Sequence, residues 1–370
     1  RARGWEVELL SGLLIVRGLG DLQVAPQMRA IVDAFRRTPG VISVTASDRR
    51  PAPDNTSLSN VKLLSNPSVE PTLLFEWIGP DYIQTYGLRV VAGRGLDTNH
   101  RLDDIDGVRL KALANQGLGI NIMVNAAAAR QLGFNPKHVV GERLRLGVAD
   151  HVGIVATIVG VVADVRFVSP RTPPPPQTYL MDSHLGPPDQ PSSWSAAVRV
   201  RDGTQAEVRQ RLAGVWRSLA PGAPFQADTV QVTMKPFYDG DARRGQLFAA
   251  GAVLSAAIAC LGLYGLAAFN TSRRVKEIGI RKTLGASTAD VLRLLVGEFL
   301  RPVLWANLIA WPAAYLAMRW WLAGFDQRIS LNPAFFLIPS LAAILVAVLT
   351  VAEQAIRVSH AEPSRALRYE

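Results

Sequence analysis

Cysteine is almost absent from this chain of 370 residues, because Cys260 is the only one. A single thiol excludes an intrachain disulfide and a thiolate metal site, and it leaves the redox compartment undetermined. The histidines are scattered and show neither an H-E-x-x-H motif nor any other paired spacing. We therefore expect no metal ion in this chain. The five histidines are His100, His138, His151, His184 and His360.

Motifs for nucleotide chemistry and for catalysis are also missing. No G-x-x-x-x-G-K-[ST] phosphate loop occurs, and no nucleophile stands at a recognisable spacing from a base. We expect neither an enzyme nor a bound cofactor here, so that any ATP-Mg would be held by a partner ATPase. The chain opens at Arg1 without a charged segment followed by an apolar run, so no signal peptide is visible and a fragment is expected.

Positive charge is in excess, with 40 Lys and Arg against 30 Asp and Glu and a net charge of +10. No lysine-rich run and no basic stretch interleaved with aromatic residues is present, which argues against nucleic-acid binding. The remaining explanations are anionic lipid and the basic bias of the cytoplasmic segments of a membrane protein.

Residues 1–241 show the alternation of short helices and strands that is typical of an α+β domain. We expect two lobes, one of them a split β-α-β unit, and a truncated N-terminus. The polar segment Arg49 to Glu70 predicts a loop, and Gly160 is a candidate break in a buried strand. The proline-rich segment Pro170 to Pro176 predicts a polyproline II conformation, as a connector or as an SH3-type ligand. The expected helices are 26–37, 125–132 and 204–219, and the expected strands are 41–45, 153–165, 196–200 and 227–232.

Residues 242–370 contain long uncharged runs, and we expect an all-α membrane domain with three spans at about 247–269, 302–320 and 333–353. The first run, as a helix, would be about 34 Å long and would exceed the bilayer core of about 30 Å. Small residues recur in it at every fourth position, which predicts a face that packs closely on another helix. These residues are Gly251, Ser255 and Ala259.

The connection from Asn270 to Arg301 is rich in Arg and Lys, which places it in the cytoplasm. The tail after the last span then lies on the same side, and the large domain lies outside. Within the connection, Gly285 and Ala286 break the helix, and Ser287 with Asp290 predicts a capping box for the next one.

The segment Glu277 to Ser287, EIGIRKTLGAS, resembles the signature of the FtsX-like permease domain of MacB-type ABC transporters. Further blocks resemble successive parts of that family's periplasmic core domain: Val124 to Gly133, Gly141 to Leu144 and Ile158 to Asp164. Residues 362–369, EPSRALRY, are similar to the family's C-terminal ending. The resemblance follows the family's order over most of the chain.

This resemblance implies a multi-pass permease of the bacterial inner membrane with a MacB-like periplasmic core domain at 1–241 and an FtsX-like domain at 242–370. It implies an ABC ATPase subunit as partner, a second permease unit as a dimer or tandem repeat, contact with lipid, and a periplasmic adaptor. Efflux is the activity that the family suggests. The alternatives are a regulator that transports nothing, a lipoprotein-release permease, and a membrane-tethered sensor.

The resemblance also assigns a relay that couples the ATPase to the periplasmic domain. Carried over by position, its residues are Glu277, Ile278, Gly279, Arg281, Lys282, Gly285 and Ala286. The alternative for the same residues is a basic membrane anchor that contacts no partner. The family unit has a fourth span before its periplasmic domain, and this chain shows none there.

One acidic cluster is unexplained by these patterns: Asp97, Asp103, Asp104 and Asp106. The ligand spacing of a helix-loop-helix calcium site, with its glycine and final glutamate, is absent. We expect a solvated loop here, with calcium binding as the alternative.

Overall fold

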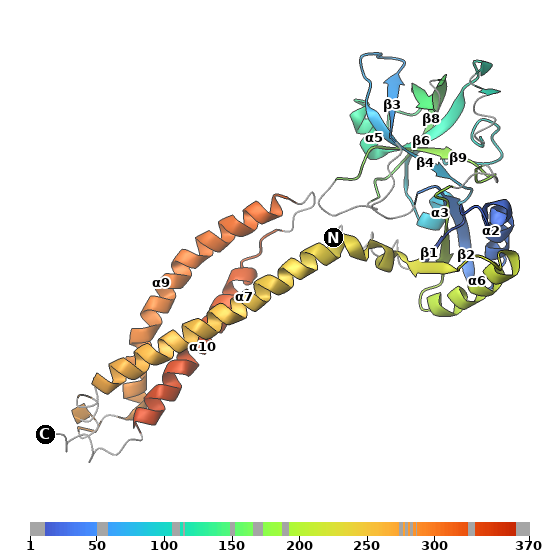
Figure 1. The fold of residues 1–370 in the computed structure, drawn as a ribbon. Helices are drawn as coiled ribbons and strands as arrows, with labels where there is room; N and C mark the ends of the chain where they lie inside the picture. Colours follow the sequence, from blue (N-terminus) through green and yellow to red (C-terminus); the bar gives the residue numbers. More distant parts are fainter. Residues whose placement is uncertain are drawn as a thin grey trace. The chain divides into compact units, whose positions relative to one another are not determined.

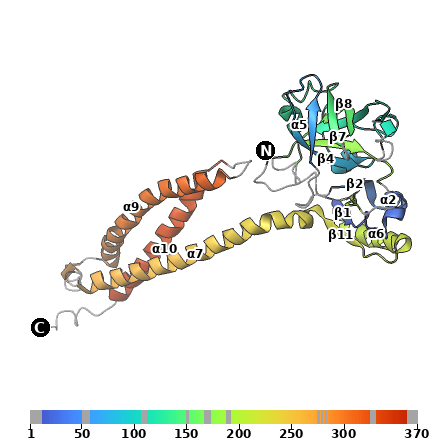
Figure 2. The same cartoon turned by 45° about the horizontal axis from the view of Figure 1, so that its top comes forward.

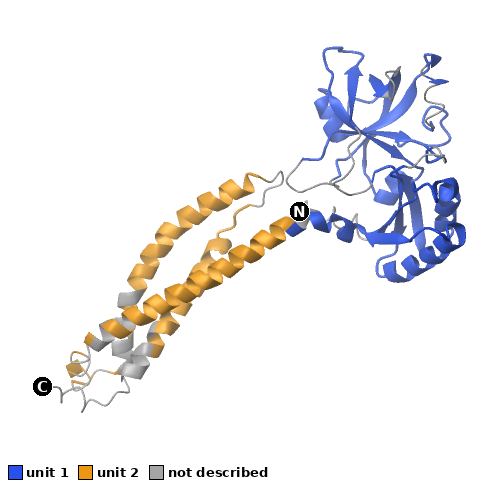
Figure 3. Ribbon diagram, in the orientation of Figure 1, with its two compact units in different colours: residues 1–239 blue, residues 240–370 orange. Residues whose placement is uncertain are grey.

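The structure is a computed structural model that divides into two compact units, Arg1–Asp239 and Gly240–Glu370 (Figure 3). The described residues are 12–49, 58–105, 112–113, 115–148, 152–165, 173–186, 192–273, 277, 280–281, 284–285, 287–324 and 330–359.

One lobe of the first unit is an antiparallel sheet in the order β11-β1-β10-β2, on which helices α2 and α6 lie side by side (Figure 1). The chain crosses from β1 through α2 to β2, and β10 lies between these two strands. This arrangement confirms the predicted split β-α-β lobe. Its elements are β1 (Leu13–Arg17), η1 (Ala25–Gln27), α2 (Met28–Arg36), β2 (Val41–Ser47), β10 (Ser195–Val200), α6 (Gln205–Leu219) and β11 (Gln226–Thr229).

The other lobe is inserted between β2 and β10. Its strands pair in the order β4-β3-β7-β8-β6-β9, and a parallel pairing of β9 with β4 closes them into a ring. Figure 2 shows this lobe with α5 beside it. Its elements are β3 (Leu58–Leu63), β4 (Thr72–Ile78), α3 (Tyr82–Tyr86), β5 (Val90–Gly93), β6 (Ile120–Asn125), α5 (Ala126–Gln131), β7 (Arg143–Val148), β8 (Val152–Val162) and β9 (Gln177–Met181).

Three apolar clusters form the core of the first unit. The first fills the ring, and the second lies between the sheet and its two helices, where Phe35 and Trp216 are fully buried. The third packs α3 and the other face of β1 against the end of the ring, and it includes Tyr82 and Met123. Strands β2 and β4 pair at Ser47 and Ile78, and backbone hydrogen bonds from Asp48 to Trp77 and from Gly79 to Ala46 extend this junction. The third cluster adds apolar contacts between the two lobes.

Three expectations about the secondary structure of this unit were wrong. The predicted loop 49–70 contains β3, in which Val61 and Leu63 are buried while polar residues alternate with them. The strand expected at 227–232 ends at Thr229, because Val230 and Met234 are buried at helical spacing and begin α7. Gly160 does not break β8, which continues through it with a shift in register against β6.

The second unit consists of α7 (Val230–Arg273), whose first residues belong to the first unit, α9 (Thr288–Leu322) and α10 (Ala334–Ser359). Helices α9 and α10 pack on each other, and Trp311 Nε1 donates a 2.7 Å hydrogen bond to Ser340 Oγ. Most large apolar side chains described in these helices are exposed. Such exposure is typical of a surface that contacts lipid or another protein.

Among the helices that the structure describes, Asp239–Leu266 is long and apolar enough to cross a membrane. It overlaps the first predicted span. The apolar part of α10, Ala334–Thr350, is shorter than this candidate span. The uncharged part of α9 lies between Arg301 and Arg319 and includes the polar residue Asn307. The second and third spans therefore stay predictions.

Candidate functional site

The predicted coupling segment begins where α7 ends. The carboxylate of Glu277 lies 2.7 Å from a guanidinium nitrogen of Arg281, one helical turn further on, and both side chains are nearly half exposed. Ile280 and Leu284 are exposed on the same segment, and Gly285 has a φ of 92°. A positive φ is a helix-ending conformation that glycine adopts readily. Helix α9 then begins at Thr288, with Ser287 directly before it.

The remaining predicted coupling residues are Ile278, Gly279, Lys282 and Ala286, and they lie outside the described residues. At the end of α7 the guanidinium of Arg273 lies 4.5 Å from the centre of the Phe269 ring. The described part of this segment thus offers both charges and apolar side chains to a partner, and the role of its residues stays a prediction.

The predicted packing face of α7 is exposed at Gly251, Ser255 and Ala259. A Cβ atom added at Gly251 would meet no other atom within 4 Å. The face can therefore accept another helix at close range, and its role in packing stays a prediction.

In the first unit, two of the blocks that carry the family resemblance meet at α5. Asn125 Oδ1 accepts hydrogen bonds from the backbone of Ala128 and of Gln177, both at 2.9 Å. Asp164 accepts one from Ala127 N at 2.7 Å and pairs with Arg130 at 2.5 Å. These contacts fix the start of α5 and join β6, β8 and β9 around it.

A buried carboxylate that the sequence reasoning missed lies where the two lobes join. Glu76 on β4 is 3% exposed; it accepts a 2.8 Å hydrogen bond from the Tyr82 hydroxyl and one from the Gln177 amide. Tyr86 and Tyr179 pack around the same Tyr82 ring. The sequence feature that could have indicated this site is a single acidic residue inside the otherwise apolar strand Thr72–Ile78.

Burial, followed by repulsion from Asp48, raises the pKa of Glu76 from 4.5 to about 8. Burial also raises the pKa of Asp48 to about 7, although a hydrogen bond from the Trp77 backbone opposes the shift. Near neutral pH, Glu76 is therefore mostly protonated and Asp48 is close to half protonated.

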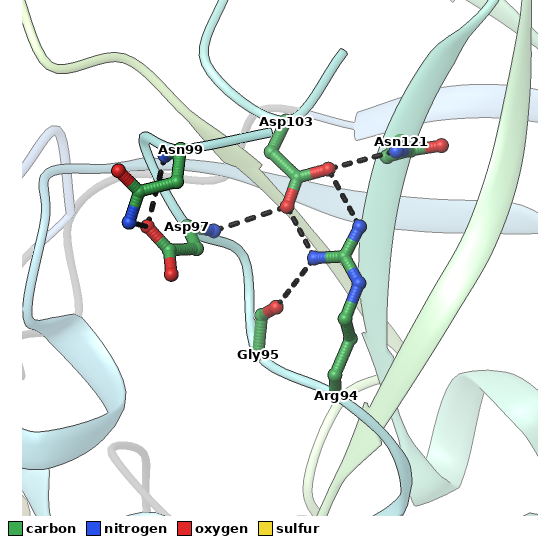
Figure 4. Close-up of polar contacts among 6 residues, drawn as sticks. All are labelled: Arg94, Gly95, Asp97, Asn99, Asp103 and Asn121. Carbon is green, nitrogen blue, oxygen red and sulfur yellow. Dashed lines mark hydrogen bonds and ion pairs between the residues drawn. The ribbon is translucent and has the colours of Figure 1, made fainter. Parts of the chain in front are cut away.

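The acidic cluster was predicted to be solvated, and for Asp103 this is wrong. Its side chain is fully buried and accepts hydrogen bonds from both terminal nitrogens of Arg94, from Asn121 Nδ2 and from the backbone of Asp97 (Figure 4). Burial opposes the charged form, but these donors together hold the pKa of Asp103 below its usual value. The network fixes the segment Arg94 to Asp103 after β5 and joins it to Asn121 on β6.

Asp104 accepts hydrogen bonds from the backbone and the hydroxyl of Ser183. It meets Asp182 and His184, and one potential ligand atom of each lies within 4.8 Å of the others. Asp182 itself accepts hydrogen bonds from the backbone of His184 and Gly186. These contacts account for the two carboxylates as supports of a turn. Asp106 lies outside the described residues.

Comparison with known proteins indicates the class of membrane protein to which this chain is similar. Residues 249–363 match the family model described as FtsX-like permease C-terminal. The match covers the predicted coupling segment, the second and third predicted spans, and the first predicted span from residue 249 on. The chain is also similar to two proteins named "Macrolide export ATP-binding/permease protein MacB". It is 24% identical to that of Agrobacterium fabrum over 75% of this chain, and 26% identical to that of Photorhabdus laumondii over 70%.

These matches support a MacB/FtsX-like ABC permease and confirm the resemblance predicted from the sequence. They support a membrane protein. The alignments cover 39% and 38% of the two relatives, so the chain spans about two fifths of their length. Among solved structures, the periplasmic region of MacB from Actinobacillus actinomycetemcomitans matches with a TM-score of 0.39 and 14% identity, over 62% of this chain and 94% of that one.

Proposed function

We propose that this chain is the permease component of a bacterial ABC transporter and that it couples ATP hydrolysis by a partner ATPase to movement of a periplasmic domain. The match of residues 249–363 to the FtsX-like permease model carries this proposal. In it, the first unit is the periplasmic domain, three helices span the inner membrane, and the direction of transport is export. The chain itself binds no ATP-Mg.

The coupling role is assigned to the segment between α7 and α9. An exposed ion pair of the Glu277–Arg281 type contributes about 0.3–0.5 kcal/mol to a helix, which is too little to explain its placement by helix stability. The exposed side chains of Ile280 and Leu284 stand beside it. A mixed charged and apolar surface of this kind suits the contact with a partner protein.

Co-purification of the full-length protein with candidate ATPase subunits, from detergent-solubilised membranes, tests the proposal. Glu277→Lys and Arg281→Glu should each abolish the complex, because each places a wrong charge at the contact. The double variant Glu277→Arg with Arg281→Glu restores the ion pair within the helix and reverses its surface charges. It should also lose the ATPase if the two charges contact a partner.

Recovery of the complex by the charge-reversed double variant would instead show that the pair only stabilises the helix. Arg244→Glu, at another exposed position of α7 outside the coupling segment, is the control and should keep the complex. If no ATPase co-purifies under any condition, the ABC assignment fails and a membrane-tethered sensor becomes the better explanation.

A further inference from the structure

A groove of about 490 Å³ opens on the first unit, between the segment Ile78–Gln84 and the loop Arg94–His100. Its volume is within the range of small-molecule sites, about 300–1,000 Å³. Neither segment belongs to the predicted coupling or packing residues.

The interior of the groove is apolar. Met123 on β6 and Met181 on β9 line its base, and the partly buried side chains of Ile83 and Leu96 line its two walls. Methionine is unbranched and flexible, so a base of two methionines can adapt to apolar groups of different shape.

The rim of the groove is acidic. Asp97 and Asp81 stand on opposite walls, and the only guanidinium among the lining residues, that of Arg94, is already bound to the buried Asp103. Hydrogen bonds from the backbone and side chain of Asn99 hold the pKa of Asp97 below its usual value, so this carboxylate is charged at neutral pH. These donors engage one oxygen, Oδ1, of Asp97.

Asp81 has an unusual conformation. Its φ is 63°, which is uncommon for a residue other than glycine, and its side chain does not cap the helix that follows it. The carboxylate instead lies 3.2 Å from Arg36, and both of these side chains are about 40% exposed. The chain therefore holds this carboxylate at the rim at a cost in backbone energy.

We propose that the groove binds a small organic cation with an apolar body, which places its apolar part on Met123 and Met181 and its positive charge beside Asp97 and Asp81. A neutral or anionic molecule of the same shape would lack the attraction to the rim. The proposal rests on the proposed function in one respect: the first unit lies in the periplasm, where the groove would meet such a compound.

Binding is tested with three matched probes: 4-phenylbutylamine, 4-phenylbutanol and 4-phenylbutanoate. They share one apolar body and differ in charge. Titrations by ligand-observed NMR use the full-length protein in a nonionic detergent. The amine should bind about three- to tenfold more tightly than the alcohol, because its positive charge would lie beside two carboxylates and charge pairs at an exposed site are weak. The butanoate should bind most weakly.

The variant Asp81→Asn with Asp97→Asn removes both rim charges, and asparagine tolerates the positive φ of Asp81. It should lower the affinity for the amine to that for the alcohol and leave the alcohol unchanged. Glu207→Gln removes a charge from an exposed pair on α6 that does not line the groove, and it should change nothing. Thr98→Trp fills the groove mouth and should weaken both amine and alcohol.

Equal affinity for amine and butanoate, or full amine binding by the double asparagine variant, would overturn the proposal. So would full binding by Thr98→Trp, because the probe would then sit in the micelle or elsewhere on the protein. Co-purification of the ATPase with the double asparagine variant separates the two hypotheses. Loss of amine binding with the complex intact is expected for a groove that acts independently of the coupling segment.

Discussion

Arg94 and Asp103 form a two-point ion pair in which the Asp103 side chain is fully buried while the Arg94 side chain remains 37% exposed. The pair closes the loop that forms one wall of the groove. Because the guanidinium still contacts water, the pair is less costly to form than one with both partners buried. Loss of this contact should lower the free energy of unfolding of the first unit.

Asp103→Asn should destabilise the first unit by about 2–3 kcal/mol. This lies below the 3–5 kcal/mol typical when one partner of a fully buried pair is removed, because water can still solvate Arg94. Thermal unfolding followed by tryptophan fluorescence measures the effect. Glu207→Gln breaks an exposed pair on α6 and should cost less than about 0.5 kcal/mol. Equal losses for the two variants would contradict the assigned role of Asp103.

The buried carboxyl of Glu76 predicts a pH dependence of stability. Its pKa is raised to about 8 in the fold from 4.5, so the folded state binds more protons than the unfolded state between these values. The free energy of unfolding should therefore fall as pH rises from about 5 to 8. Asp48, with a pKa of about 7, adds to the fall below pH 7.

Glu76→Gln tests this prediction because glutamine keeps hydrogen-bonding groups next to Tyr82 and Gln177 but does not titrate. The variant should lose a large part of the pH slope and be more stable than the wild type at pH 8, by about 1–3 kcal/mol. Arg49 and the three tyrosines around Glu76 stay unchanged in it. A variant with the full wild-type slope would place the titrating group elsewhere.

A close backbone approach predicts a large effect of one methyl group. A Cβ atom at Gly160 would lie 1.9 Å from the carbonyl oxygen of Arg94. Gly160→Ala must displace this loop, and we expect a loss of stability of about 1–3 kcal/mol together with weaker amine binding in the groove. Gly214→Ala on α6 meets open space and should stabilise by about 0.5–1 kcal/mol.

The small-residue face of α7 predicts a contact with a second permease unit. In a Cys260→Ser background, Ser255→Cys should form disulfide-linked dimers in oxidised membranes, detected by non-reducing electrophoresis. Ala257→Cys lies about 200° around the helix and is the control, which should stay monomeric. Equal crosslinking at both positions would indicate random collision, and none at Ser255→Cys would argue against this face as a dimer contact.

Local sequence patterns were sufficient to predict much of the secondary structure of the first unit. The apolar positions of α2 lie at helical spacing, and Met28, Ile31, Val32 and Phe35 are all buried as that spacing predicts. Asn125 was read as the start of a helix and is its N-cap. These features depend on residues within one or two turns of each other.

The parts that sequence reasoning missed depend on distant residues. Glu76 meets Gln177, which is 101 positions away, and Asp104 meets Ser183, 79 positions away. No local periodicity encodes such pairs, because they arise only when the ring of strands closes. Asp103 was read as solvated because its burial depends on donors from Arg94 and Asn121, which no local periodicity indicates.

No loop separates β11 from α7: the strand ends at Thr229 and the helix begins at Val230. Val230 and Met234, in the first turns of this helix, are buried in the first unit's core. A pull along these turns would therefore act directly on the β1–β11 ladder, whose hydrogen bonds would share the load in shear. Because no flexible connecting segment lies between the strand and the helix, a tensile force on the helix would be transmitted directly to the sheet.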